Sequence, residues 1–252
     1  IFANGTIRYA DGQFVPVGNF RTDIQNAELE VNTGASEECI LNYYNETIGE
    51  GYYFTNADNS GDTKKYTAEE VSELAKSGPV SFNAYYAVAG KDQPVSIGAV
   101  VSTVKASVAY DNTTDKYTVT ATVTLKSPDN SVNITEEVGV YDASTGKGYY
   151  FEFTDDKGTK STQEQLNNRF EGFTGKAEIY YQCGDGKTVV KAGEVERVLE
   201  STELTYENEV FVPKGTFHTE VRSLDDSQTL KTIYTSEGKE CVLSYYDESL
   251  DE

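Results

Sequence analysis

The sequence contains no tryptophan and no methionine, and it is poor in the side chains on which most active sites depend. His218 is the single histidine, and no group of cysteine and histidine residues has the spacing of a zinc site. No segment resembles a glycine loop that cradles phosphate. We therefore expect no enzymatic activity, and we interpret His218 as a solvated residue on the outer face of a strand.

Basic residues are also scarce, because 21 lysines and arginines stand against 42 acidic residues, for a formal net charge of −21. Such a charge repels nucleic acid and anionic membrane surfaces. No apolar run approaches the length that spans a bilayer, and the sequence begins with neither methionine nor a leading apolar segment. We expect no nucleic-acid partner, no membrane span, and a chain that is a mature product or an excised fragment.

The sequence repeats itself. Gly51–Phe54 reads GYYF and returns as Gly148–Phe151, 97 positions later. A third copy is visible in two further segments, because Phe14–Phe20 is echoed by Phe211–Phe217 and the Glu38–Tyr44 segment by Glu240–Tyr246. Serial repetition of this kind indicates an array of similar modules.

Three repeat starts define the expected modules, at Ile7, Val108 and Leu204. We predict one module over residues 1–101, a second over 102–198, and the first half of a third over 199–252. A half module cannot bury its own apolar face. Either the sequence is cut from a longer protein, or a second chain completes the half module by adding strands.

The cysteines are Cys39, Cys183 and Cys241. Cys39 and Cys241 hold the same place in different repeats, and the middle repeat has no cysteine there, so the pattern excludes a disulfide repeated within each module. Alternation places Cys39 on the same face as Leu41, which predicts buried, apolar thiols at Cys39 and Cys241.

Strand patterns dominate the sequence. Residues 117–125 alternate tyrosine, valine, alanine and leucine with four threonines, which is typical of a strand with one face in a core. Each of the first two repeats also carries one helix signal, a capping box at Thr67–Glu70 and at Thr162–Gln165. Many short strands and one short helix per module predict an all-β fold of tandem antiparallel β-sandwiches.

With a helical turn ahead of the Tyr85-Tyr86 and Tyr180-Tyr181 strands, and with this module size and serial repetition, the chain resembles the tandem immunoglobulin-like modules of bacterial cell-surface proteins. The cysteine and tryptophan landmarks of antibody domains are missing. The resemblance implies an extracellular stalk, adhesin or binding module that holds an active end away from the cell wall.

One loop has the ligand spacing of a calcium site, because oxygen-bearing side chains recur two apart around a glycine at Asn56, Asp58, Ser60 and Asp62. The matching loop of the second repeat, residues 154–158, is shorter and carries a lysine. The alternative interpretation is a solvated acidic turn without a cofactor.

Tyrosine pairs recur on the predicted strands, and adjacent strand residues face opposite sides of a sheet. We predict that one ring of each pair lies in the core and that the other, at Tyr53, Tyr86, Tyr150 and Tyr181, faces outward. An outward ring either packs across the sheet surface or stacks on a glycan or a partner protein.

These observations favour a non-enzymatic stalk or adhesin segment of an extracellular, surface-located bacterial protein, with a protein or a glycan as its partner. Two alternatives stay open. The chain could be a filament subunit whose half module is completed by a neighbouring copy, or a glycan-binding module that uses exposed tyrosines.

Overall fold

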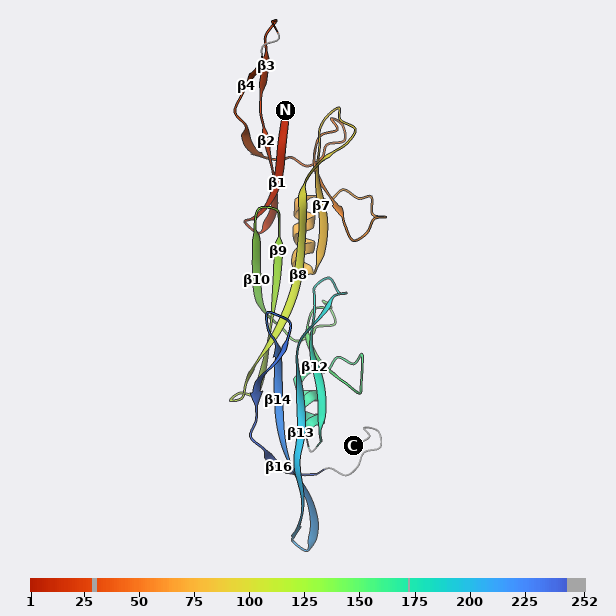
Figure 1. Ribbon diagram of the computed structural model, residues 1–252. Coiled ribbons are helices and arrows are strands. Elements are labelled where there is room, and N and C mark those ends of the chain that lie inside the picture. Colours follow the sequence, from red (N-terminus) through yellow and green to blue (C-terminus); the bar gives the residue numbers. More distant parts are fainter. Residues whose placement is uncertain (29–30, 172, 244–252) are drawn as a thin grey trace. The chain divides into compact units, whose positions relative to one another are not determined.

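The computed structural model describes residues 1–28, 31–171 and 173–243 (Figure 1). The chain is all-β, with antiparallel sheets and two short helices, as the sequence predicts. The end of the predicted third module, residues 244–252, lies outside the described residues.

Strands make up most of the chain, and one helix falls in each of the first two repeats. In chain order the elements are β1 (Phe2–Ala10), β2 (Gln13–Phe20), β3 (Asp23–Gln25), β4 (Val31–Thr33), β5 (Glu37–Ile40), β6 (Gly51–Asn56), α1 (Ala68–Ser77), β7 (Val80–Ala87), β8 (Val95–Asp111), β9 (Lys116–Lys126), β10 (Ser131–Val138), β11 (Gly148–Phe153), α2 (Gln163–Phe170), β12 (Gly175–Gln182), β13 (Val189–Glu207), β14 (Val210–Leu224), β15 (Leu230–Thr235) and β16 (Lys239–Val242).

The strands form sheets of different size. One sheet has the strand order β1-β2-β5, and a second has the order β10-β9-β8-β7-β6. A third has the order β11-β12-β13-β14-β15, with β16 paired to β14, and β3 pairs with β4 alone. The strand pairs whose residue register is defined are all antiparallel.

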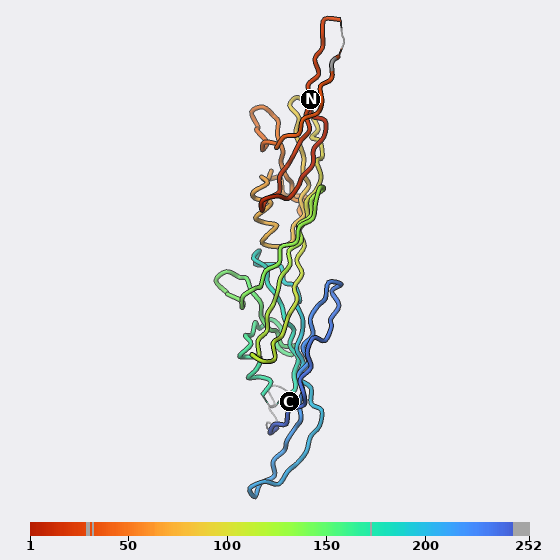
Figure 2. The backbone as a smooth tube through the Cα atoms, turned by 90° about the vertical axis from the view of Figure 1, so that its left-hand side faces the viewer, coloured from red at the N-terminus to blue at the C-terminus, as the bar shows by residue number. Residues whose placement is uncertain are grey.

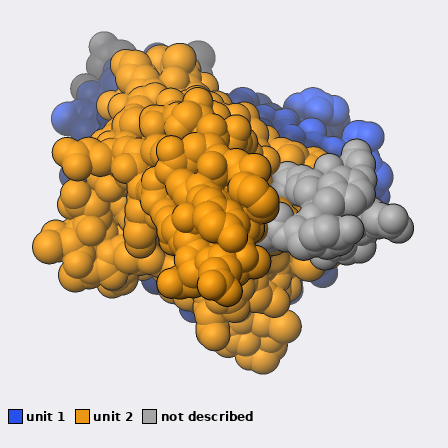
Figure 3. Space-filling model, turned by 90° about the horizontal axis from the view of Figure 1, so that it is seen from below, with its two compact units in different colours: residues 1–104, 123–134 blue, residues 105–122, 135–252 orange. Residues whose placement is uncertain are grey.

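The chain divides into two compact units (Figure 3). The module boundaries predicted at residues 101 and 198 stay a prediction. Unit 1 comprises residues 1–104 and 123–134, and unit 2 comprises residues 105–122 and 135–252. Unit 1 therefore contains a β-hairpin from the second repeat, built from the end of β9 and the start of β10.

Hydrogen bonds hold this hairpin in unit 1. The side chain of Asn130 donates to the carbonyl of Tyr9 at 2.9 Å and accepts from the amide of Tyr9 at 2.8 Å. Beside it, the hydroxyl of Thr6 donates to the carboxylate of Asp129 at 2.5 Å. The first strand of repeat one is thus bound to residues more than 120 positions away in the sequence.

Unit 2 has the same arrangement, with the hairpin taken from the third repeat. The distal part of β14, Thr219–Ser223, pairs with Gly193–Arg197 of β13. The hydroxyl of Ser223 accepts a hydrogen bond from the amide of Val108 at 3.0 Å, and Lys105 donates to the carbonyl of Asp226 at 2.7 Å. In both units, therefore, a hairpin of the following repeat is part of the compact structure.

The strand predicted over residues 117–125 is β9, and its pattern has the expected consequence. Tyr117, Val119, Ala121 and Leu125 are buried. The threonines between them lie on the half-buried face. Alternation with period two thus places one face of the strand in a core.

The helix signals are also confirmed. The Thr67 hydroxyl accepts from the amide of Glu70, and the Glu70 carboxylate accepts from the amide of Thr67. Thr162 and Gln165 form the same reciprocal cap on α2. Each cap satisfies two amides that a helix start leaves without intrahelical partners.

Helix α1 completes the core of unit 1. Val71 and Ala75, one helical turn apart, are fully buried. The Ser72 hydroxyl accepts a hydrogen bond from the amide of Phe14, which fixes the helix against β2. One cluster of buried residues includes members from β1, β2, β6, β7, β8, β9 and α1. Both large sheets of unit 1 and its helix therefore share a single core.

The backbone conformation and the close packing at the first position of each GYYF segment require glycine. Gly51 has φ +130° and Gly148 has φ +128°, in the region that favours glycine. A Cβ at Gly51 would lie 2.7 Å from the carbonyl oxygen of Tyr43, and one at Gly148 would lie 2.6 Å from the Cα of Tyr141. This close approach lets Tyr43 bridge to Tyr52, and Val140 to Tyr149, in parallel.

The cysteine prediction was wrong for Cys39 and was met only in part for Cys241. Cys39 is exposed, Cys241 is half-buried, and Cys183 is buried, with all three thiols free. Cys39 lies with Leu41 along one cavity beside β5, as the alternation predicts, but Cys39 is exposed because this space is open and not filled by core side chains.

Candidate functional site

The four tyrosines predicted to face outward are mostly buried. Tyr86, Tyr150 and Tyr181 are 5%, 5% and 4% exposed, and Tyr53 is half-buried. Tyr52 pairs directly with Tyr86 across antiparallel strands, so both rings lie on the core side. The prediction of exposed rings at Tyr86, Tyr150 and Tyr181 was wrong. Tyr86 and Tyr181 lie on the core side of their strands, whereas Tyr150 faces the opposite side and is buried there by its neighbours.

The outer face of unit 1 instead carries a row of three rings, which we call the tyrosine ladder. Tyr53 lies 5.7 Å from Tyr44 and 5.7 Å from Tyr85, measured between ring centroids. The ammonium of Lys65 lies 3.6 Å from the centroid of Tyr44 and 4.9 Å from that of Tyr53. A lysine thus covers one end of the row in cation–π contact.

Unit 2 repeats this ladder. Tyr150 lies 5.8 Å from Tyr141 and 5.8 Å from Tyr180, and the Lys160 ammonium lies 3.7 Å from the centroid of Tyr141. Lys160 also bonds to the side-chain oxygen of Gln182. The contacts of Lys160 help to explain why Tyr150 is buried, although Tyr150 lies on the face of β11 opposite the core. Sequence reasoning missed the two lysines, although each stands shortly before a capping threonine.

The rings of the two ladders can stack and donate hydrogen bonds. Burial raises the pKa of Tyr53 and of Tyr150. Burial, followed by a hydrogen bond to Glu178, raises the pKa of Tyr180. Tyrosine rings are flat and amphipathic, which suits contact with a sugar ring or a protein surface.

The predicted calcium loop is a set of local turns. Asn56 accepts from the amide of Asp58, and Asp62 accepts from the amide of Lys64 and from the Tyr66 hydroxyl, the latter at 2.6 Å. The Tyr66 hydrogen bond is the main reason why the pKa of Asp62 is lowered. Over the described ranges no three histidine, cysteine or acidic residues gather as a metal site. Calcium binding by Asn56, Asp58, Ser60 and Asp62 stays a prediction.

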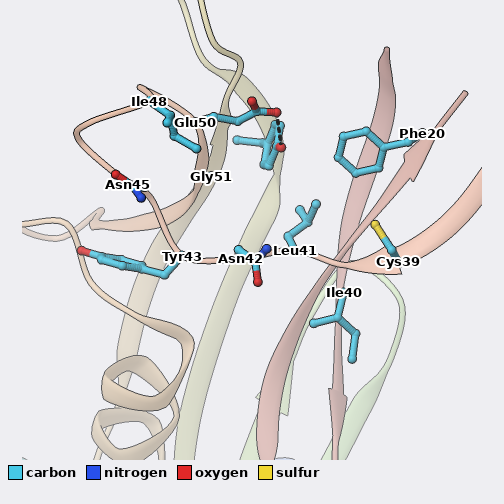
Figure 4. Close-up of a pocket in the computed structure, with 11 residues that line it drawn as sticks. Phe20, Cys39, Ile40, Leu41, Asn42, Tyr43, Asn45, Ile48, Glu50 and Gly51 are labelled. Atoms are coloured by element: carbon cyan, nitrogen blue, oxygen red, sulfur yellow. Dashed lines mark hydrogen bonds between the residues drawn. The ribbon is translucent and has the colours of Figure 1, made fainter. Parts of the chain in front are cut away.

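A cavity of about 400 Å³ opens in unit 1 beside β5 (Figure 4). Phe20, Cys39 and Leu41 line one part of it, and the Glu50 side chain lies at another. The Glu50 carboxylate accepts a hydrogen bond from the Tyr86 hydroxyl at 2.7 Å. Burial and this bond raise the pKa of Tyr86.

The lining of this cavity does not assemble a catalytic group. Glu50 is the single carboxylate among the lining residues, and the cavity includes no histidine or lysine to activate the Cys39 thiol. Ile40 and Ile48, which are 72% and 60% exposed, add apolar surface. The cavity therefore offers apolar contact, the side-chain amides of Asn42 and Asn45, and a Glu50 carboxylate that already accepts a hydrogen bond.

Unit 2 carries a charged cluster that the sequence analysis did not anticipate. The Glu194 carboxylate, whose side chain is 5% exposed, lies within 3.2 Å of the amines of Lys176 and Lys191 and the guanidinium of Arg222. The amine of Lys191 also bonds Glu178 at 2.7 Å. Each positive group has a carboxylate partner, so the cluster is a satisfied structural network.

His218 is half-buried and lies between two carboxylates. Its Nδ1 is 2.9 Å from Glu200 and its Nε2 is 3.5 Å from Glu220. The sequence predicted a solvated outer face, whereas the side chain is only 15% exposed. These polar neighbours are acidic, and they do not include a serine or cysteine nucleophile.

Comparison with known proteins gives no relative. No protein-family model, curated protein or solved structure matches the chain. Neither α1 nor α2 is long or apolar enough to cross a bilayer, and they are the helices of the described chain.

Proposed function

We propose that the chain is a non-enzymatic segment of a bacterial cell-surface protein, an extracellular array of immunoglobulin-like β-sandwich modules that serves as a stalk or adhesin segment. The observation that carries the proposal is that each unit contains a hairpin from the following repeat. Unit 1 includes residues 123–134 of the second repeat, and unit 2 includes the third-repeat hairpin around Ser223.

A unit that contains a hairpin of the following repeat suits a load-bearing array. A unit cannot open completely without releasing the hairpin of the next repeat, so neighbouring repeats depend on one another for stability. Antiparallel strand pairs such as β13–β14, which runs from Gly193 to Glu207 on β13, must also be separated. Independent domains joined by flexible linkers would lack this mutual dependence.

Single-molecule pulling on the full 252-residue chain tests the proposal. We expect discrete unfolding events, each releasing about 3.5 Å of length per unfolded residue. The forces should equal or exceed those of a single reference β-sandwich tethered in series. Unfolding of both units below the force of the reference would contradict a load-bearing role.

A second candidate, glycan binding, is favoured by the tyrosine ladder that recurs in both units. Tyr44 and Tyr85 are half-buried and retain surface for a sugar ring. A glycan array probed with the full chain and with a Tyr44→Ala, Tyr85→Ala double variant tests this candidate. Hits that the double variant loses support it, and an array without hits removes it.

A further inference from the structure

Each repeat begins with a β-hairpin, and the apolar positions of this hairpin are buried in two repeats and exposed in the third. Ile7 and Val108 are 0% and 5% exposed, whereas the matching Leu204 is 65% exposed. The next pair of matching residues gives the same contrast. Phe14 is 1% exposed and Phe211 is 69% exposed.

The third hairpin nevertheless has the same internal structure as the first. Tyr9 pairs with Phe14 at a ring distance of 5.1 Å, and Tyr206 pairs with Phe211 at 4.9 Å. A third strand pairs with the hairpin in both repeats, since β5 pairs with Val17–Phe20 of β2 and β16 pairs with Lys214–Phe217 of β14. The exposure is therefore not a result of different strand pairing.

In the complete repeats, the second half of the repeat covers this hairpin. In unit 1, Ser72 of α1 bonds the amide of Phe14, and Val71 of the same helix is in one core cluster with Phe14 and with Phe54 of β6. In unit 2, Phe151 of β11 packs 5.2 Å from Tyr117, which occupies the place of Phe14. The cover is a strand–helix–strand segment in both cases.

In the third repeat, this hairpin projects from the rest of unit 2, and no helix or further sheet lies beside its tip among the described residues (Figures 1 and 2). We call the surface formed by Leu204, Tyr206 and Phe211 the open face. Three large apolar side chains that are each about two-thirds exposed on one hairpin mark a surface that binds a partner.

We propose that the open face is the docking surface for a strand–helix–strand segment of the same repeat type, equivalent to Gly51–Ala87. The occupant is identified by the two complete repeats, in which residues of this kind bury the matching positions. The inference goes beyond the proposed function, because it holds whether or not the array bears force.

A second copy of the described chain does not supply this segment without loss. Its own β6–α1–β7 and β11–α2–β12 segments already cover its own first hairpins, through Val71 and Phe151 among others. Release of either segment would expose a core that includes Phe14 or Tyr117. The open face therefore fits a strand–helix–strand segment that does not already cover the first hairpin of its own repeat.

The chain itself offers a direct test, because Leu243–Glu252 follows the residue pattern of Leu41–Glu50. Residues 51–134 can be appended after Glu252 at the spacing of the first repeat. This extension supplies the strands and the helix of the cover, together with the hairpin of residues 123–134 that completes unit 1. Native-state hydrogen exchange at the amides of residues 204–212 then reports on docking. We expect stronger protection in the extended chain than in the 252-residue chain.

Phe211→Ser distinguishes docking from a general effect of the extension. In the 252-residue chain, we expect it to change the opening equilibrium of the third hairpin by less than about 3-fold, since Phe211 is exposed. In the extended chain, we expect at least about a 100-fold change, since a buried aromatic side chain is lost. Val210→Ser is the matched control, because Val210 occupies the place of the exposed Gln13 and should have little effect in both chains.

Two results would overturn the proposal. One is an equal effect of Phe211→Ser in both chains, or no gain of protection on extension. The other is a dimer of the 252-residue chain, detected by light scattering, that Phe211→Ser dissociates, because a second copy would then cover the open face. Failure of the pulling experiment would leave these results unchanged, so the two proposals can fail separately.

Discussion

The first hairpins of repeats one and three share their strand pairing and differ in burial, because only the first is covered by a helix and a second sheet. Phe14 and Phe211 face matching tyrosines across matching turns, yet one is 1% exposed and the other 69%. The comparison shows that this hairpin forms in the absence of the cover. The cover decides how much the hairpin contributes to stability.

The largest expected effect is at Phe14. Phe14→Ala should lower the free energy of unfolding of unit 1 by about 3–5 kcal/mol, because it opens a cavity in a closed core. Phe211→Ala should change the stability of unit 2 by at most about 0.5 kcal/mol, because no core is opened. Urea denaturation followed by hydrogen exchange measures both, and similar costs for the two variants would break the comparison.

A smaller effect is expected at the charged cluster, which is present in unit 2 and has no counterpart at the equivalent positions of unit 1. The residues Glu178, Lys191 and Glu194 stand where unit 1 has Asn83, Ser96 and Ala99 in the equivalent strand pairs. Glu194→Ala should destabilise unit 2 by about 1–3 kcal/mol, because it leaves three positive groups with fewer partners.

Urea denaturation measures this effect as well. The control is Glu137→Ala, which removes an exposed ion pair at 3.9 Å and should cost little. Equal effects of the two variants would show that the cluster contributes no more than a surface pair.

Removal of the helix caps tests whether α1 and α2 contribute equally to the stability of their units. Thr67→Ala and Thr162→Ala should each cost about 1 kcal/mol, since both remove the same capping hydrogen bond. Thermal unfolding with exchange readout in α1 and α2 assigns each loss to its unit. A cost in one unit only would show that the equivalent helices carry unequal shares of stability.

The smallest difference is expected in acid. A hydrogen bond from Lys157, then one from Lys191, lowers the pKa of Glu178 from 4.5 to about 2. A carboxylate whose pKa is depressed in the folded state stabilises it above the unfolded pKa, and this contribution is lost as the pH falls from about 4.5 to about 2. Unit 2 should lose this stability over that range, and Glu178→Gln should remove the corresponding part of the pH dependence. An unchanged acid profile in the variant would exclude this role.

Local sequence signals predicted the local structure well. The alternation of residues 117–125 gave β9, and the boxes at Thr67 and Thr162 gave the starts of α1 and α2. In each case the relevant contacts lie within a few residues or along one strand. Periodicity and capping chemistry therefore carry the required information.

Features that depend on distant pairing were not predicted. The faces of Tyr86 and Tyr181 are set by the strands opposite them, and the place of Asn130 in unit 1 depends on bonds to Tyr9. Similarity between repeats marks where a repeat begins, but it does not show which hairpin completes which core. The charged cluster around Glu194 also escaped notice, since its members come from three strands.

Hydrogen exchange in an Asn130→Ala variant tests most directly that a unit is completed by the following repeat. Asn130 belongs to the second repeat, and its side chain makes two hydrogen bonds to Tyr9 in the first. We predict faster exchange at the amides of residues 7–17 in unit 1, with unit 2 unchanged, and the mirror result in unit 2 for Ser223→Ala. Faster exchange confined to residues 105–122 and 135–243 in the Asn130→Ala variant would contradict the account.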